Sequence, residues 1–306
     1  METNHEVRKL REKDREILLS FLYPRRTEAL FLLSNLERGD IEGGQELFEG
    51  DYFGFFHEEK LRGVLMQVRQ GSLLIACSHP LGQFELAKAF LQHHQKKEDE
   101  SPGQVHRILG LNEEVQGFFE VLEEHSLWKS REVREAALLV LTKDTLESRP
   151  QLFVRLAQES DIDVLLKWKK SFRVDAMGDD PSWIDEEVLR ESLELGIQEK
   201  RQFILEQHSK PVSMARLNAV SGRVAQLGGV FTPKEHRGKG YASKMVSGLA
   251  NQCLVENFQG EFVGDYEALV LTVDEESKKA LKIYRDLGFL GLGTFRFHLV
   301  EDPVFS

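Results

Sequence analysis

The stretch FTPKEHRGKGYA, residues 231–242, constrains the fold more than any other part of the sequence. A strand-like apolar run, RVAQLGGVF, leads into it, and a helical run with apolar residues at i, i+3 and i+4 spacing follows it. The turn itself holds Arg237, Gly238, Lys239 and Gly240. Glycines that join a strand to a buried helix leave backbone amides exposed at the positive end of the helix dipole. Such a turn suits a phosphate or pyrophosphate.

Length, charge and cysteine content narrow the class of protein. The chain has 306 residues, and at roughly 150 residues per domain two domains are expected. A net charge of −11 argues against a nucleic-acid partner, which needs a basic face. Cys77 and Cys253 fall in different halves, which disfavours a disulfide framework or a cysteine metal site. Without a signal-like or membrane-spanning apolar run, we expect a cytoplasmic protein with no membrane partner.

The order of predicted elements repeats along the chain. A polar segment at residues 142–151 separates the halves, and an acid-led helix start occurs in both, DREILL at Asp14 and DIDVLL at Asp161. Each half is expected to place helices before three antiparallel strands and a β-α-β-α-β order after them. We therefore predict an α+β fold with a mixed sheet, built from two tandem domains, residues 1–147 and 148–306. Each domain is a mostly antiparallel twisted sheet flanked by helices.

Three interpretations of the glycine turn compete. It is a solvated basic turn, a dinucleotide-binding glycine loop, or the cofactor loop of an acyl-CoA transferase. The dinucleotide motif expects a third small residue and an opening β-α-β unit, and here an antiparallel meander comes first. Gly228 and Gly229 favour a bulge or a close backbone approach in the preceding strand, with simple packing relief as the alternative.

The neighbouring motifs favour the third interpretation. RGKGYA resembles the arginine/glutamine-x-x-glycine-x-glycine/alanine loop of the GNAT superfamily of acyl-CoA-dependent N-acyltransferases. LGGVFTP resembles the central strand of that family, and LTVDEESKKALKIYRDLGF resembles its second cofactor segment. The resemblance extends over residues 151–300 and implies two tandem GNAT-like domains.

The resemblance also implies the ligand and the residues that hold it. The co-substrate is expected to be acetyl-CoA, with no metal, its pantetheine arm lying along a gap that the bulge opens between two strands. The residues expected to bind coenzyme A are Val230, Phe231, Thr232, Arg237, Gly238, Lys239, Gly240, Tyr241, Ala242, Ser243 and Ser277. At Ser277 the sequence departs from the family, in which asparagine is common at this position.

Tyr284 occupies the position of the family's usual tyrosine acid. A phenol can protonate a departing thiolate. The alternative is that Tyr284 packs on one face of an amphipathic helix. A backbone N–H near Val230 is expected to polarise the thioester oxygen. Glu206, Asp274 and a relayed water remain open as the general base.

Several polar residues have a structural and a functional interpretation. Four acids precede or begin the predicted helices of the second half. They either attract a cationic amine or mark the helix starts: Asp175, Asp179, Asp180 and Asp185. His93 and His94 lie on a polar helical run without metal-ligand spacing, and we expect them to be solvated.

The first half lacks the glycine loop, since Gly82 stands alone without a neighbouring cation, and it lacks the tyrosine acid. It is therefore interpreted as a degenerate GNAT-like copy without cofactor.

The predicted function is transfer of an acyl group, expected to be acetyl, from acyl-CoA to a primary amine of a small molecule or peptide by direct attack. The alternative is a non-catalytic acyl-CoA-binding regulatory or sensor protein. We expect a monomer or a homodimer.

Overall fold

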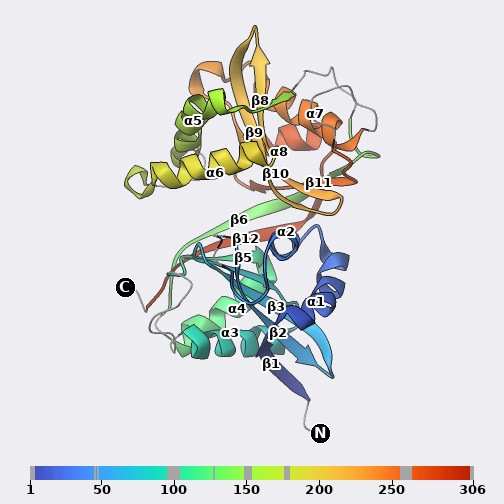
Figure 1. Ribbon diagram of the computed structural model, residues 1–306, viewed down its shortest axis with the longest axis vertical. Coiled ribbons are helices and arrows are strands. Elements are labelled where there is room, and N and C mark those ends of the chain that lie inside the picture. Colours follow the sequence, from blue (N-terminus) through green and yellow to red (C-terminus); the bar gives the residue numbers. More distant parts are fainter. Residues whose placement is uncertain are drawn as a thin grey trace. The chain divides into compact units, whose positions relative to one another are not determined.

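The computed structural model describes residues 4–44, 46, 48–94, 104–126, 128–147, 154–175, 180–255 and 264–303. The chain divides into two compact units (Figure 1). Unit 1 comprises Met1–Leu138, Thr272–Glu276 and Leu292–Ser306, and unit 2 comprises Leu139–Leu271 and Ser277–Gly291. Strand β6, Lys129–Thr142, runs from the first unit into the second.

Unit 1 has a sheet in the order β1-β2-β3-β4-β5-β12. Its strands are β1 His5–Lys9, β2 Gly50–His57, β3 Lys60–Val68, β4 Ser72–Ala76, β5 Arg107–Leu111 and β12 Leu290–Glu301. Neighbouring strands are antiparallel except β4 and β5, which are parallel. The helices are α1 Arg15–Leu22, α2 Leu30–Arg38, α3 Pro80–His94 and α4 Asn112–His125.

Strands β2, β3 and β4 of unit 1 are buried on both faces. Successive residues alternate between two apolar clusters, as β2 shows with Phe53 and Phe55 in one and Tyr52 and Phe56 in the other. One cluster includes α3 and α4, and the other includes α1 and α2, so helices cover both faces of the sheet (Figure 1).

Unit 2 repeats this plan with a sheet in the order β11-β10-β9-β8-β7. Its strands are β7 Val154–Leu156, β8 Gln202–Gln207, β9 Lys210–Ser221, β10 Val224–Phe231 and β11 Ala268–Asp274. Among the pairs that these described strands form with one another, β10 and β11 are parallel and the others are antiparallel. The helices are α5 Ile162–Asp175, α6 Glu186–Gln198, α7 Tyr241–Leu254 and α8 Lys278–Asp286. The predicted α+β fold, with a mixed sheet flanked by helices, is confirmed.

An arginine–aspartate pair opens both copies. Arg8 donates two hydrogen bonds of 2.8 Å to Asp14, which also accepts the backbone N–H of Arg11 at 2.9 Å. In unit 2, Arg155 donates bonds of 2.7 and 2.9 Å to Asp161, which accepts the N–H of Gln158 at 2.8 Å. Each carboxylate caps the turn that leads into α1 or α5. The predicted acid-led helix starts are therefore confirmed as the same local structure.

The last strand pairs with the first copy. Phe295 of β12 lies opposite Leu111 of β5, and His298 lies opposite Ile108. The sequence predicted that this strand completes the second half, but its pairing with β5 places residues from 292 onward in unit 1. The division at residues 147 and 148 follows the sequence repeat, and we retain it as a proposal about that repeat.

Two expectations for unit 1 are wrong. His94 is not solvated: it is 4% exposed, and its Nε2 lies 2.8 Å from the buried Asp302 carboxylate. His93 Nε2 lies 3.2 Å from Asp51. Both contacts join residues far apart in sequence, so the local helical pattern does not reveal them. The charged strand β1 was also missed, since it lies at the edge of the sheet and lacks an apolar run.

We predict that Asp14 makes unit 1 sensitive to acid. The hydrogen bonds from Arg8 lower the pKa of Asp14 to about 2. A lowered folded-state pKa stabilises the fold above the unfolded value, and this contribution disappears as the pH falls from about 4 to about 2. Asp14→Asn should therefore cost about 2 kcal/mol near neutral pH and flatten the acid limb of stability measured by urea unfolding. Asp163→Asn, at a side chain 93% exposed, is the control. An equal loss in both variants would contradict the prediction.

Candidate functional site

The site begins where β10 separates from β11. The parallel ladder covers only Val224–Gln226 and Ala268–Val270, although β10 continues to Phe231. On its other side β10 stays paired with β9, with register shifts on both sides of the Leu227–Gly228 pairs. The predicted bulge is confirmed. It leaves the end of β10 with a backbone edge that β11 does not use.

The two glycines of the bulge have different roles. Gly229 has φ +58°, in the left-handed region, and a Cβ there would meet only Arg216 Cβ at 3.9 Å. A Cβ on Gly228 would overlap the Asn218 side chain. Gly229 therefore supplies the left-handed backbone conformation of the bulge, and Gly228 leaves room for the Asn218 side chain. The bulge and the packing relief that the sequence suggested as alternatives are both present.

The glycine turn leaves the start of α7 open. Gly238 and Gly240 have φ +79° and +75°, and added Cβ atoms would meet nothing within 4 Å. Gly240 is the N-cap of α7, without a side-chain cap, and the first helical bond runs from Lys244 N–H to Gly240 at 3.1 Å. The amides of Tyr241, Ala242 and Ser243 consequently precede the first helical hydrogen bond. They stand at the positive end of the helix dipole in an exposed turn, an arrangement that can bind an anion.

The basic side chains of the turn fold back on the protein. Arg237 Nε donates to the Thr232 carbonyl at 3.0 Å, and Nη2 lies 3.1 Å from Asp175. Its guanidinium also lies over the Phe231 ring, 5.6 Å from the centroid. Lys239 Nζ lies 3.5 Å from the Glu235 carbonyl. Arg237 therefore ties the turn to the end of β10, a structural role beyond the charge that the sequence suggested.

Ser213 of β9 is a positioning residue that the sequence analysis missed. Its hydroxyl donates to the Phe231 carbonyl at 2.9 Å and lies 3.0 Å from the Thr232 hydroxyl. It fixes the end of β10 from the β9 side. A buried serine within an otherwise apolar strand was the available signal.

Tyr284 lies on α8 and is half-buried. Its ring meets Phe289 edge-on with centroids 5.5 Å apart, and among the described residues its hydroxyl has no hydrogen-bond partner. Burial raises the pKa of the phenol to about 12, so it keeps its proton across the physiological range. Ser277, the N-cap of α8, is exposed and makes no side-chain cap. The hydroxyl of Tyr284 is thus available as a donor, and its ring also packs, as the alternative interpretation expected.

Glu206 and Asp274, the two carboxylates considered as the general base, both have other hydrogen-bond partners. Glu206 Oε1 accepts hydrogen bonds from Arg155 Nη2 at 2.6 Å and Nε at 2.8 Å, and the same arginine also pairs with Asp161. Asp274 falls in the Thr272–Glu276 segment of unit 1 and accepts the Glu276 N–H at 2.8 Å.

The acids before α6 mostly begin helical turns. Asp180 accepts the Ser182 N–H at 2.8 Å, and Asp185 caps α6. Asp175 instead bridges Lys234 and Arg237, both at 3.1 Å. Asp179 lies outside the described residues. The helix-start interpretation is confirmed for Asp180 and Asp185.

In unit 1, side chains fill the region that corresponds to the separation of β10 and β11. The β4–β5 ladder also stops early, at Leu74 and Leu109. Here Gln83 is buried, its Nε2 donates to the Cys77 carbonyl at 2.8 Å, and a Cβ on Gly117 would overlap its amide. A Cβ on Gly82 would come within 2.7 Å of Cys77 Sγ. The glycine of unit 1 thus serves tight packing, whereas those of unit 2 face open space.

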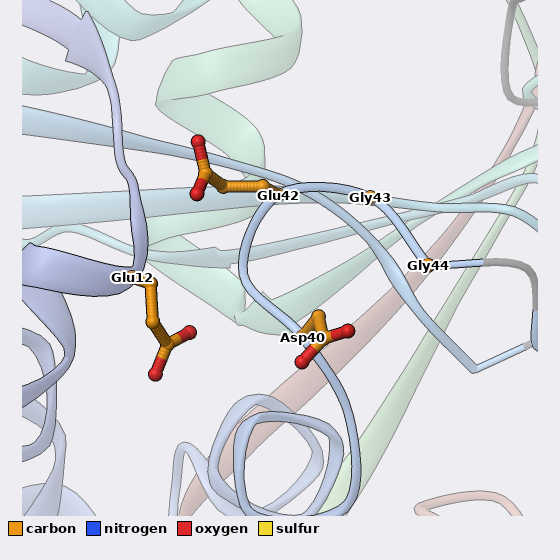
Figure 2. Close-up of a pocket in the computed structure, with 5 residues that line it drawn as sticks. All are labelled: Glu12, Asp40, Glu42, Gly43 and Gly44. Atoms are coloured by element: carbon orange, nitrogen blue, oxygen red, sulfur yellow. The ribbon is translucent and has the colours of Figure 1, made fainter.

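A separate hollow of about 250 Å³ in unit 1 is acidic. Figure 2 shows Glu12, Asp40 and Glu42 around it, beside Gly43 and Gly44. Glu12 pairs with Arg15, and Glu42 lies 4.0 Å from Arg11. No group of side chains in the described ranges could hold a metal ion, and no helix there could span a membrane.

Comparison with known proteins extends these observations. Residues 165–289 match the sequence family described as the acetyltransferase (GNAT) family. No curated protein matches the chain. A GNAT-family acetyltransferase from Colwellia psychrerythraea aligns over 97% of this chain and 100% of its own, at 15% identity and a TM-score of 0.51. A GCN5-related N-acetyltransferase from Sphaerobacter thermophilus aligns over 97% and 95%, at 14% identity and 0.54. A tandem GNAT protein from the clavulanic acid biosynthesis pathway aligns over 97% and 98%, at 9% identity and 0.52. At these identities the similarity to solved structures establishes the fold alone.

We predict that the left-handed conformation at Gly240 is required for α7 to begin. Gly240→Ala should destabilise the protein by about 1 to 2 kcal/mol, because the added Cβ disfavours positive φ even where space is open. Gly291→Ala is the matched control, since that glycine also faces open space but lies outside the left-handed region. Thermal unfolding would measure both, and equal melting temperatures for the two variants would refute the prediction.

Proposed function

We propose that unit 2, in which residues 165–289 match the acetyltransferase (GNAT) family, transfers an acyl group from acyl-CoA to a primary amine. The acyl group is expected to be acetyl, and the amine belongs to a small molecule or a peptide. The main support for this proposal is the end of β10, which does not pair with β11 beyond Gln226 and leads directly to the uncapped start of α7. A cytoplasmic location, the lack of a nucleic-acid partner and a monomeric or homodimeric state remain predictions.

The residues present suit coenzyme A. The backbone of Val230, Phe231 and Thr232 offers an edge for the amides of the pantetheine arm, as an added strand would use it. The diphosphate would meet the amides from Gly238 to Ser243, where the open glycines leave room. Lys239 adds positive charge, and Arg237 holds the turn in place. Ser277 remains a proposed contact from the start of α8.

The proposed reaction is direct attack without a covalent enzyme intermediate. The amine nitrogen bonds to the thioester carbonyl carbon, whose oxygen is stabilised by a backbone N–H near Val230. The carbon–sulfur bond then breaks, and the sulfur takes the proton of the Tyr284 hydroxyl. The amine releases its extra proton to water, and the phenolate recovers one from solvent.

The high pKa of Tyr284 has two consequences for this step. The phenol stays protonated, so the donor is present at every working pH. Because a free thiol titrates near pH 8.5, proton transfer from such a phenol is favourable only if burial also raises the pKa of the thiol. Tyr284 can therefore protonate the departing thiolate only if the sulfur lies in the same partly dry environment as the phenol.

We predict that Tyr284→Phe lowers kcat by about 10²–10⁴-fold and leaves the Kd for coenzyme A unchanged, because only proton donation is lost. Steady-state kinetics on a panel of amines and calorimetry with coenzyme A would measure the two effects. Tyr266→Phe, a tyrosine of the same unit outside the site, is the control. Unchanged turnover in Tyr284→Phe would remove the acid role. Binding without turnover on any amine would favour the alternative of an acyl-CoA-binding regulatory protein.

We further predict one coenzyme A per chain, since Gln83 fills the equivalent region of unit 1. Gly238→Asp should weaken binding about tenfold or more, because a carboxylate would repel the diphosphate. Gly222→Asp is the matched control: this glycine also has positive φ, with open space around it, but lies in the β9–β10 turn. Two equivalents in calorimetry, or equal Kd values for both variants, would contradict the assignment.

A further inference from the structure

Asp175 ends α5 at a place where a helix disfavours negative charge. The last turn of a helix carries the negative end of the helix dipole, which cations stabilise and carboxylates oppose. Asp175 is the last residue of α5, and its side chain is 21% exposed. A carboxylate in this position gains from cations that another element supplies.

The turn that leads into α7 supplies two such cations. Lys234 Nζ lies 3.1 Å from Asp175 Oδ1, and Arg237 Nη2 lies 3.1 Å from Oδ2. The hydrogen bond from Lys234 is the main cause that lowers the pKa of Asp175, and Arg237 lowers it further, so the carboxylate is ionised near neutral pH. Each oxygen of the carboxylate thus serves one cation of the turn.

The same two cations adjoin the amides that are proposed to bind the diphosphate. Lys234 begins the short 3-10 turn that precedes these amides, and Arg237 is the residue next to Gly238. A phosphate group offers such cations a pair of anionic oxygens, as the Asp175 carboxylate does. In this structure the carboxylate therefore occupies positive charges that a diphosphate would use.

The ion pairs of Asp175 suit exchange better than permanent anchoring. The side chains of Lys234 and Arg237 are 72% and 47% exposed, and ion pairs between exposed groups contribute little free energy. A diphosphate carries more charge than one carboxylate and also accepts hydrogen bonds from backbone amides. Arg237 donates to the Thr232 carbonyl independently of Asp175, so the turn stays tied to β10 when the carboxylate leaves.

A hollow beside the contact gives the carboxylate room to move. Its volume is about 410 Å³, and it lies between the last turns of α5 and the segment before α6. The residues around it are Lys170, Ser171, Val174, Asp175, Pro181 and Ile184. Because Asp175 both lines this hollow and contacts the turn, rotation of its side chain can carry the carboxylate from the turn toward the hollow.

We propose that Asp175 is an internal competitor of coenzyme A: its carboxylate binds Lys234 and Arg237 in the free protein, and the diphosphate displaces it. This inference rests on the proposed coenzyme A site of unit 2. The competing carboxylate lowers the affinity of the empty turn for anions. Binding of coenzyme A then releases the charge of Asp175 to the hollow at the end of α5.

The test is calorimetric titration of coenzyme A into matched variants. Asp175→Asn should lower the Kd about three- to tenfold, because the competing charge is lost while the turn keeps its cations. Asp163→Asn is the matched control, since it removes the same charge from the same helix, but Asp163 pairs with Arg190. A Kd in Asp175→Asn that equals or exceeds that of Asp163→Asn would overturn the proposal.

Ionic strength separates competition from a change in the shape of the turn. Salt screens exposed charges, and the Debye length falls from about 10 Å at 0.1 M to about 3 Å at 1 M. The gain in affinity of Asp175→Asn over the parent should therefore shrink to less than about twofold at 1 M salt. A gain that persists unchanged at 1 M would show that the substitution reshapes the turn, and the proposal would be wrong.

Inorganic pyrophosphate separates this inference from the proposed function. It is titrated into the parent protein and the same two variants. Tighter binding of pyrophosphate in Asp175→Asn alone supports the competition even if coenzyme A does not bind, in which case the proposed function fails by itself. The inference is overturned if neither ligand binds, or if both bind the parent and Asp175→Asn equally.

Discussion

The early separation of β10 from β11 is the constraint on which the rest of the site depends. Parallel strands normally satisfy each other's backbone groups along their whole length, and an unused edge in a sheet interior is costly unless something pairs with it. In unit 2 the ladder stops at Gln226, the bulge at Gly228 and Gly229 turns the strand, and Ser213 fixes its end from the other side. The free edge then leads to the open amides that begin α7.

The two copies show how one backbone plan serves two purposes. Both open with the same arginine–aspartate pair, and both end their parallel ladder early. In unit 1 the carbonyl of Cys77 is used by Gln83, and Gly82 lets α3 pack directly on the strand. In unit 2, no described atom lies within 4 Å of the positions that Cβ atoms on Gly238 and Gly240 would take. We interpret this difference as the division between a packed copy and a ligand-binding copy.

Sequence patterns predicted what depends on local residues. The acid-led helix starts at Asp14 and Asp161 were readable, and the glycine pair marked the bulge. The patterns did not reveal contacts between distant residues. Such contacts depend on how separate elements come together. Examples are the pairing of β12 with β5, the His94–Asp302 contact and the Asp175–Arg237 contact.

The central claim is that coenzyme A binds unit 2 along the end of β10, with its diphosphate at the start of α7. The most direct measurement is a crystal structure of the chain with coenzyme A. The account predicts diphosphate oxygens within hydrogen-bond distance of amides between Gly238 and Ser243, and the pantetheine arm beside Val230 to Thr232. Coenzyme A bound in unit 1, or with its diphosphate away from the start of α7, would contradict it.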